Sequence, residues 1–218
     1  EKGFKIELIR HQETQKDPYT DEEIMRLLEP PKSKTNFVEL RTYTIIQWII
    51  ATGNRISTVI NIKNSDINFK RKTITLAHTK NKKLQEIPLS DSLARAIKSY
   101  QKKTANMGIR SEYLFFNIYG EQLTPNAIKQ SLRDYNLARG VNKTSAHLLR
   151  HTFAKNYISQ GGDCMTLQNI LGHSSITMTR RYVNLCTEDL QKNYENYSLL
   201  DRVSSPNTGK KRHTKLAS

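Results

Sequence analysis

Cysteine, long apolar runs and acidic residues are all scarce in this chain of 218 residues. The two cysteines, Cys164 and Cys186, form no C-x-x-C pair, which argues against a disulfide framework and against a structural zinc site. The most apolar stretch, Tyr43–Ala51, is interrupted by Gln47 and is too short to cross a bilayer. The first residues, Glu1–Lys5, lack the apolar segment of a signal peptide. We therefore expect a cytoplasmic protein with reduced thiols and no membrane partner.

The shortage of acidic residues leaves a large positive charge. Lysine and arginine together number 35 against 20 aspartates and glutamates, which gives a formal net charge of +15. Such an excess favours a polyanionic partner, and nucleic acid is the first candidate. Apolar residues make up 36% of the chain, and its length suits one domain, alone or with an appendage. A chain of this size can bury a hydrophobic core.

Helix signals recur along most of the chain. Thr20 and Glu23 form a capping box, and the helix that they begin should end near Glu29, before two consecutive prolines. Gly53 is a natural residue just after a helix, and Thr124-Pro125 is a natural helix start. Further helices are expected, by residue number, at 36–52, 55–62, 92–103, 124–140, 145–161, 165–171, 176–184 and 187–197.

Strand signals are confined to residues 66–116. Thr73–Leu76 and Leu84–Ile87 alternate in polarity on either side of a basic turn, and Asp66–Phe69 can add an edge strand. Leu114–Phe116 is either a strand or a buried loop. The sum is an α+β fold, mostly α, with one small antiparallel sheet. Such a sheet is too small for a doubly wound architecture.

The expected organisation along the chain has three parts. Residues 1–18 form a linker, residues 19–200 form the folded domain, and residues 201–218 form a basic, flexible tail. The tail is assigned from its polar composition and from the run Lys210-Lys211-Arg212.

Several polar side chains stand at positions suited to phosphodiester chemistry. Arg55 lies in the segment A-T-G-N-R-I-S, and His147 and Arg150 form an H-x-x-R pair on one face of an expected helix. The segment L-G-H supplies His173, and Tyr182 follows nine residues later. Arginine binds phosphate oxygens through a planar, permanently charged fork, and a tyrosine hydroxyl can be the nucleophile. Each motif is common by itself, so the indication comes from the set.

The motifs occur in one order: G-x-R-x-S, a lysine in the turn of a β-hairpin, H-x-x-R, L-G-H and a tyrosine. This set resembles the catalytic domain of the tyrosine recombinases, the family of phage integrases and Xer recombinases, over residues 20–200. The resemblance implies the fold of that catalytic domain. It also implies site-specific DNA recombination, the integration or excision of a mobile element, through a 3′-phosphotyrosyl intermediate. No metal and no cofactor are implied, because the arginines supply the positive charge.

The resemblance also assigns roles to individual residues. The implied catalytic set is Arg55, Lys80, His147, Arg150, His173 and Tyr182. In this set the arginines bind the phosphate, the tyrosine attacks it, His147 can accept the tyrosine's proton, and Lys80 protonates the leaving 5′ oxygen. Lys82 and Lys83 lie in the same expected turn and compete with Lys80 for that role. Thr58 stands where the family usually has an acidic residue, so a bracing carboxylate is missing at this position.

Double-stranded DNA carrying attachment or core sites is the partner that the resemblance implies. The side chains expected to contact DNA are Lys63, Arg71, Lys82, Lys83 and Arg181. We expect a tetramer on DNA and a monomer in isolation, with a directionality factor as a further partner. The segment at residues 187–200 either packs on its own domain or docks onto a neighbouring protomer.

Three other functions are consistent with parts of the sequence. A type IB topoisomerase would share the chemistry, and a non-enzymatic DNA-binding factor could share the scaffold without the reaction. A helix-turn-helix repressor would fit the spacing from Gly161 to Ile176, although it explains neither Arg55 nor Tyr182. The chain is expected to be either the catalytic part of a longer integrase, whose family members commonly carry a core-binding domain before it, or a naturally short protein.

Overall fold

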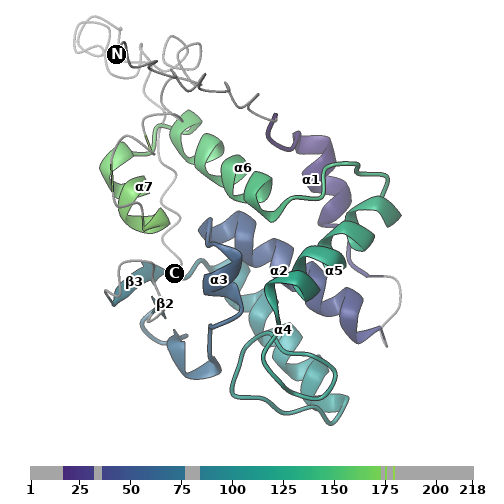
Figure 1. The fold of residues 1–218 in the computed structure, drawn as a ribbon. Helices are drawn as coiled ribbons and strands as arrows, with labels where there is room; N and C mark the ends of the chain where they lie inside the picture. The colour runs from purple at the N-terminus through teal and green to yellow at the C-terminus, as the bar shows by residue number, and fades with distance from the viewer. Residues whose placement is uncertain (1–16, 32–35, 77–83, 173–174, 176–178, 180–218) are drawn as a thin grey trace, which may run out of the picture.

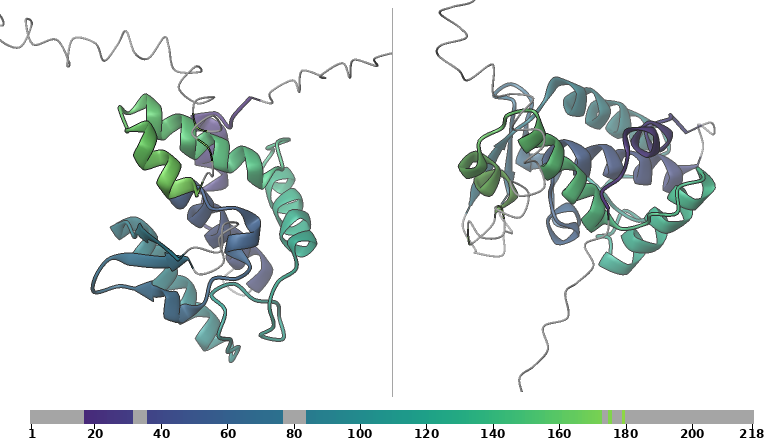
Figure 2. Two further views of the ribbon diagram at one scale, coloured as in Figure 1. Left: turned by 60° about the vertical axis from the view of Figure 1, so that its left-hand side comes forward. Right: turned by 90° about the horizontal axis from the view of Figure 1, so that it is seen from above.

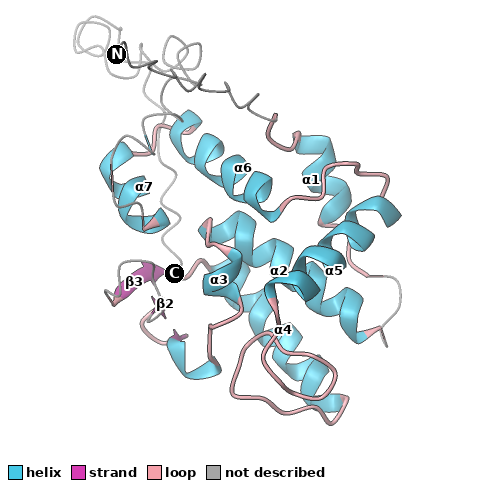
Figure 3. Cartoon of the chain, in the orientation of Figure 1, coloured by secondary structure: helices cyan, strands magenta, loops and turns pink. Residues whose placement is uncertain are grey.

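Helix α2 (Phe37–Thr52) is central in the computed structural model, which describes residues 17–31, 36–76, 84–172, 175 and 179. It contacts α4 (Asp91–Asn106), α5 (Pro125–Ala138) and α6 (Ala146–Ser159) (Figure 1). The other elements are α1 (Asp21–Leu27), α3 (Ile56–Val59), the 3-10 helix η1 (Asn64–Asp66), β1 (Ile67–Asn68), β2 (Thr73–Leu76), β3 (Gln85–Pro88) and α7 (Cys164–Leu171). The expected α+β fold, mostly helical with one small sheet, is confirmed (Figure 3).

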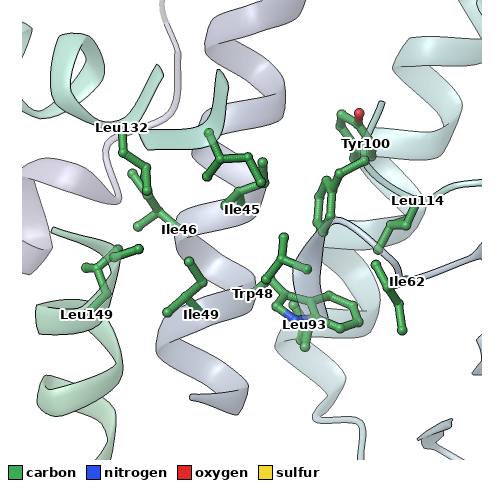
Figure 4. Close-up of a cluster of buried hydrophobic side chains, with 14 of the residues drawn as sticks. Ile45, Ile46, Trp48, Ile49, Ile62, Leu93, Tyr100, Leu114, Leu132 and Leu149 are labelled. Carbon is green, nitrogen blue, oxygen red and sulfur yellow. The ribbon is translucent and has the colours of Figure 1, made fainter. Parts of the chain in front are cut away.

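The core forms around α2 because almost every turn of that helix is covered by a neighbour. Ile46, Trp48 and Ile49 have no exposed surface. The buried side chains that surround them include Leu93, Tyr100, Leu132 and Leu149, which come from α4, α5 and α6 (Figure 4). Burying each large apolar side chain contributes roughly 1.5–3 kcal/mol, so this helix is fixed by packing more than by helix propensity.

Leu114–Phe116 is a buried loop, which decides between the two alternatives left by the sequence. Phe115 is fully buried, and its ring meets Trp48 edge-on with 5.8 Å between ring centroids. Only isolated bridges flank the segment, from Lys63 to Tyr113 and from Phe116 to Gln122. The loop therefore closes the core beneath α2 and α4 without joining the sheet.

The sheet is antiparallel, in the order β1-β2-β3. Ile74 of β2 pairs with Ile67 on one side and with Ile87 on the other, and all three side chains are buried on the face toward the core. The expected edge strand is present but has only two residues. Strand β3 begins at Gln85 rather than at Leu84, and it pairs there with Leu76. Figure 2 shows the sheet on one side of α2 and α5 on the other.

Helix ends follow the capping signals closely. The capping box of Thr20 and Glu23 is present, although α1 ends at Leu27, two residues before the expected end. Helix α4 begins earlier and ends later than expected, because Ser90 accepts a hydrogen bond from the backbone N–H of Leu93 and no breaker precedes Gly108. Helix α3 stops at Val59, short of the expected end at residue 62.

Other expectations concern residues that the structure does not describe. The helix expected at 187–197, the tail at 201–218, most of the linker at 1–18 and all but residue 179 of the helix expected at 176–184 lie outside the described residues. Within the described part of the chain, no helix combines the length and the hydropathy needed to cross a bilayer.

The first described residues are hydrogen-bonded to α6 and to the loop before it. The backbone N–H of Tyr19 donates to Thr152 Oγ1 at 3.0 Å, and its hydroxyl donates to the carbonyl of Lys143 at 2.9 Å. Burial raises the pKa of the Tyr19 phenol, which keeps it protonated as a donor. Lys143 Nζ closes the cluster by donating to the carbonyl of Pro18 and to Glu23 Oε2, both at 2.8 Å. These contacts tie the start of the domain to the loop before α6 and to α6 itself.

Gly53 is a position next to the arginine site where a side chain would damage the fold directly. Its φ is +64°, and an added Cβ would lie 2.5 Å from Phe153 Cδ1 and 2.6 Å from Leu171 Cδ2. We expect Gly53→Ala to lower the free energy of unfolding by about 3 kcal/mol, from left-handed backbone strain plus overpacking. Gly108→Ala is a matched control, because its φ is +77° with nothing within 4 Å, and it should lose only about 1 kcal/mol. Urea denaturation of the two variants makes the comparison, and equal losses would contradict the steric argument.

Candidate active site

The segment that carries Arg55 is held rigidly at the end of α2. Gly53 turns the chain in the left-handed conformation and donates its N–H to the carbonyl of Ile49 at 2.7 Å. The next residue, Asn54, is buried and accepts a hydrogen bond from Trp48 Nε1 at 2.9 Å. Arg55 then begins α3 with a partly exposed side chain. The arginine therefore leaves the backbone from a fixed point beside the core.

Arg150 is the most deeply buried charged side chain in the described part of the chain, with 2% of its surface exposed. It lies on α6, and its Nη1 donates to the carbonyl of Gly53 at 2.6 Å. Its Nη2 donates to the carbonyl of Leu171, the last residue of α7, at 3.0 Å. A buried guanidinium is tolerated only with such partners, so these carbonyls fix its position.

The two arginines converge on one atom. Arg55 Nη1 also donates to the carbonyl of Leu171, at 3.3 Å, although Arg55 and Arg150 lie 95 residues apart in the sequence. Two forked cations whose nitrogens share one acceptor form a concentrated positive site. Guanidinium forks of this kind match the oxygens of a phosphate group. The structure thus brings together the two arginines that the sequence singled out.

Helix α6 carries a second polar feature near its start. Ser145 accepts a hydrogen bond from the backbone N–H of His147, and the His147 side chain is exposed. His147 Nε2 lies 2.8 Å from His151 Nε2, and the two rings are perpendicular with centroids 4.3 Å apart. Nitrogens at this distance form a hydrogen bond when one ring donates and the other accepts, so the tautomers of the two rings are linked. His147 therefore shares its face of α6 with another imidazole as well as with Arg150.

Helix α7 is closed at both ends in a way that fixes its last carbonyl. Asp163 caps its start by accepting a hydrogen bond from the backbone N–H of Thr166 at 2.6 Å, and this bond holds the pKa of the Asp163 carboxyl below its usual range. Gly172 ends the helix in the left-handed conformation with φ of +61°. Leu171 lies between them and is buried, so its carbonyl is presented to the arginines from a defined helix end.

Several predicted site residues lie outside the described residues: Lys80, Lys82, Lys83, His173, Arg181 and Tyr182. Of the two predicted DNA contacts that are described, Lys63 already pairs with Glu112 at 2.7 Å. Arg71 is more exposed, with its Nη2 3.8 Å from Glu86 Oε1. Thr58 lies in α3, where its backbone N–H donates to the carbonyl of Arg55 at 2.9 Å. Within the described ranges, no group of three or more metal-ligating side chains is gathered.

Two side chains of this region, His151 and Gln85, are not part of the motifs identified in the sequence. His151 follows His147 by four residues, which is the spacing of neighbours on one helix face, so the signal was available. Gln85 is the other, because its Nε2 donates to the carbonyls of Asn169 and Ile170 at the end of α7. No sequence spacing predicts the contact between Gln85 and α7, because its acceptors are backbone carbonyls, which every residue has.

Comparison with known proteins gives a consistent result. Residues 19–188 match the model of the phage integrase family. The tyrosine recombinase XerA of Pyrococcus furiosus is 31% identical over 188 residues, which cover 84% of this chain and 63% of that protein. The chain therefore spans less than two thirds of the length of this relative.

Solved structures give the same answer for the fold. The crystal structure of XerA recombinase has a TM-score of 0.69 and 26% identity, covering 88% of this chain and 66% of that one. The XerH site-specific recombinase bound to its difH substrate has a TM-score of 0.65 and 24% identity, covering 82% of this chain and 53% of that one.

The different burial of the two arginines leads to a stability test. Arg150→Ala removes two charge-assisted hydrogen bonds to buried carbonyls, and we expect it to lower the free energy of unfolding by about 3 kcal/mol. Arg55→Ala acts on a partly exposed side chain whose hydrogen bond to Leu171 is longer, at 3.3 Å, and it should cost less, about 1 kcal/mol. Urea denaturation without DNA measures both. An Arg150→Ala variant as stable as the parent would mean that desolvation of the guanidinium cancels its hydrogen bonds.

Proposed function

The chain belongs to the phage integrase family, and from this membership we propose that it recombines double-stranded DNA at specific sites by cleaving and rejoining strands. The observation that carries the proposal is the convergence of Arg55 and Arg150 on the carbonyl of Leu171. Gly172 and His173 follow that carbonyl directly in the sequence. The site is thus built around a cationic pair with the L-G-H motif beside it.

In the proposed cleavage step, the hydroxyl oxygen of Tyr182 bonds to the scissile phosphorus, and the bond from phosphorus to the 5′ oxygen breaks. The tyrosine proton passes to His147, and Lys80 gives a proton to the 5′ oxygen, which leaves as a hydroxyl. Arg55 and Arg150 hold the non-bridging oxygens while charge accumulates on them. Each oriented donor of this kind is worth roughly 10²–10³ in rate. Attack by another 5′ hydroxyl on the phosphotyrosine reverses the step and rejoins the strands.

The proposal extends to substrate, assembly and place of action. The fold is shared with XerH, which was captured on its difH DNA substrate, and the net charge of +15 suits a DNA partner. We assign residues 19–200 to the catalytic domain, with residues 1–18 as a linker and 201–218 as a basic tail. The active assembly is a tetramer on DNA that can respond to a directionality factor. Such an enzyme would act in the cytoplasm beside the nucleoid.

The alternative functions have no observation in their favour. A non-enzymatic DNA-binding factor would have no need for two arginines on one carbonyl. A type IB topoisomerase would share the cleavage chemistry but would relax supercoiled DNA without a specific site. Relaxation of a plasmid that lacks any selected site therefore separates the topoisomerase from the recombinase.

Covalent capture tests the proposed function even when the target sequence is unknown. A pool of nicked duplexes with a randomised segment is incubated with the protein, and DNA that survives denaturation as a protein adduct is recovered and sequenced. The nick lets the short strand that carries the released 5′ hydroxyl diffuse away. Rejoining then lacks its attacking hydroxyl, so the phosphotyrosine accumulates. We expect an enriched sequence and an adduct on Tyr182.

The matched variant is Tyr182→Phe, which loses one oxygen. It should bind the selected DNA with the affinity of the parent and form no adduct. An adduct that persists in Tyr182→Phe would place the nucleophile elsewhere. Specific binding of the parent with no adduct on any nicked duplex would favour the non-enzymatic factor.

Arg71 is the better supported DNA contact of the two that the structure describes, because its side chain is more exposed and its ion pair is longer, 3.8 Å against 2.7 Å for Lys63. We expect Arg71→Ala to reduce the slope of log K against log salt concentration by about 0.9, because one fewer phosphate is neutralised by the protein. Arg71→Lys keeps the charge and should keep the slope. Titration of labelled DNA at several salt concentrations measures it, and an unchanged slope in Arg71→Ala would remove Arg71 from the interface.

A further inference from the structure

The carboxyl end of α7 is held by side chains from three other elements. The last carbonyls of a helix lack partners within the helix. Here Leu171 O accepts from Arg55 and Arg150, while Asn169 O and Ile170 O accept from Gln85 Nε2, the latter at 3.2 Å. Asn169 O also accepts from the backbone N–H of Gly172, at 3.0 Å. Three consecutive carbonyls are therefore bonded from outside the helix, two by one amide and one by both arginines.

Gln85 is itself fixed in place. It is the first residue of β3 and pairs with Leu76, the last residue of β2. Its side chain is partly buried, and its Oε1 would lie 3.1 Å from a Cβ added to Gly172. The amide thus packs over the glycine that ends α7. The sheet is anchored in the main core through Ile74 and Leu76, so Gln85 connects α7 to a rigid part of the molecule.

Among the described residues, the apolar contacts of α7 are made mainly with α6. Its buried residues Leu167 and Leu171 pack with Ala154 in a small cluster that is separate from the main core. That cluster joins α7 to α6 on one side only. Figure 1 shows α7 beside α6, with the sheet next to its lower end. Loss of the Gln85 amide would remove the contact between this helix end and the sheet, and would leave the hydrogen bonds from Arg55 and Arg150.

We infer that Gln85 is a positioning residue for the two phosphate-binding arginines. It holds the last turn of α7 so that the carbonyl of Leu171 stays where Arg55 and Arg150 both reach it. Gln85 acts through the backbone of α7 and does not touch the phosphate. The inference rests on the proposed function, because it concerns the phosphate site of the same reaction.

The variant that isolates this role is Gln85→Met. Methionine has nearly the volume and length of glutamine but no N–H donor, and it adds no charge near the DNA. Glu86→Ala is the matched control on the same strand. Glu86 is exposed, and its carboxylate faces Arg71, away from α7. Both variants are assayed at saturating protein, so that differences in DNA affinity do not enter the rate.

The measurement compares two versions of the captured nicked duplex, one with an ordinary phosphate and one with a methylphosphonate at the scissile position. A methyl group in place of a non-bridging oxygen removes the negative charge that the arginines must hold. A defect in arginine placement therefore slows reaction of the phosphate more than that of the methylphosphonate. We expect Gln85→Met to form the adduct roughly tenfold more slowly than the parent on the phosphate, and about as fast as the parent on the methylphosphonate.

The ratio of the two rates does not depend on the fraction of protein that is folded, because misfolding lowers both rates equally. An equal loss on both substrates would show a general structural role and overturn the inference. So would unchanged rates in Gln85→Met, or a shift of the same size in Glu86→Ala. If the parent forms no adduct on either substrate, the proposed function fails, and the inference fails with it.

Discussion

One backbone oxygen, that of Leu171, accepts hydrogen bonds from both guanidinium groups of the candidate site and so joins Arg55 to Arg150. Two like charges repel when they are brought to a common point, and one of them belongs to a nearly buried side chain. The end of α7 offsets that repulsion. A helix carries about half a negative charge at its carboxyl end, and cations are stabilised there. The arginines therefore stand together because a helix end faces them.

The same arrangement explains why distant parts of the chain must fold together before a site exists. Arg55 comes from the turn after α2, Arg150 from the middle of α6, and the shared acceptor from α7. The Gly53 carbonyl adds a second bond to Arg150, and Gly53 itself has no room for a side chain against Phe153 and Leu171. Gly53 and Leu171 are therefore close neighbours in the packing and also supply the carbonyls that hold the Arg150 guanidinium.

The sequence predicted the elements of this fold well where local chemistry decides them. The Thr20 capping box, the left-handed Gly53 and the start at Thr124-Pro125 all lie where the signals placed them. Helix lengths were less predictable, as α4 shows, because propensity extends a helix until a breaker comes. The choice between strand and loop at Leu114–Phe116 depended on tertiary packing, which periodicity does not record.

For the site, the motif order brought Arg55, His147 and Arg150 into one hypothesis. The motif order could not show that Arg150 is buried. Nor could it show that Arg55 and Arg150 donate to the same carbonyl, because every residue has a carbonyl. The phosphate roles stay predictions, as do the roles of Lys80, His173 and Tyr182.

The fastening of Tyr19 to Thr152 and Lys143 has a mechanical consequence. A force on the chain before residue 17 would be transmitted through the hydrogen bond of Tyr19 to Thr152, which lies in α6 two residues after Arg150. The helix that orients the buried cation is thus also the one on which upstream chain would pull.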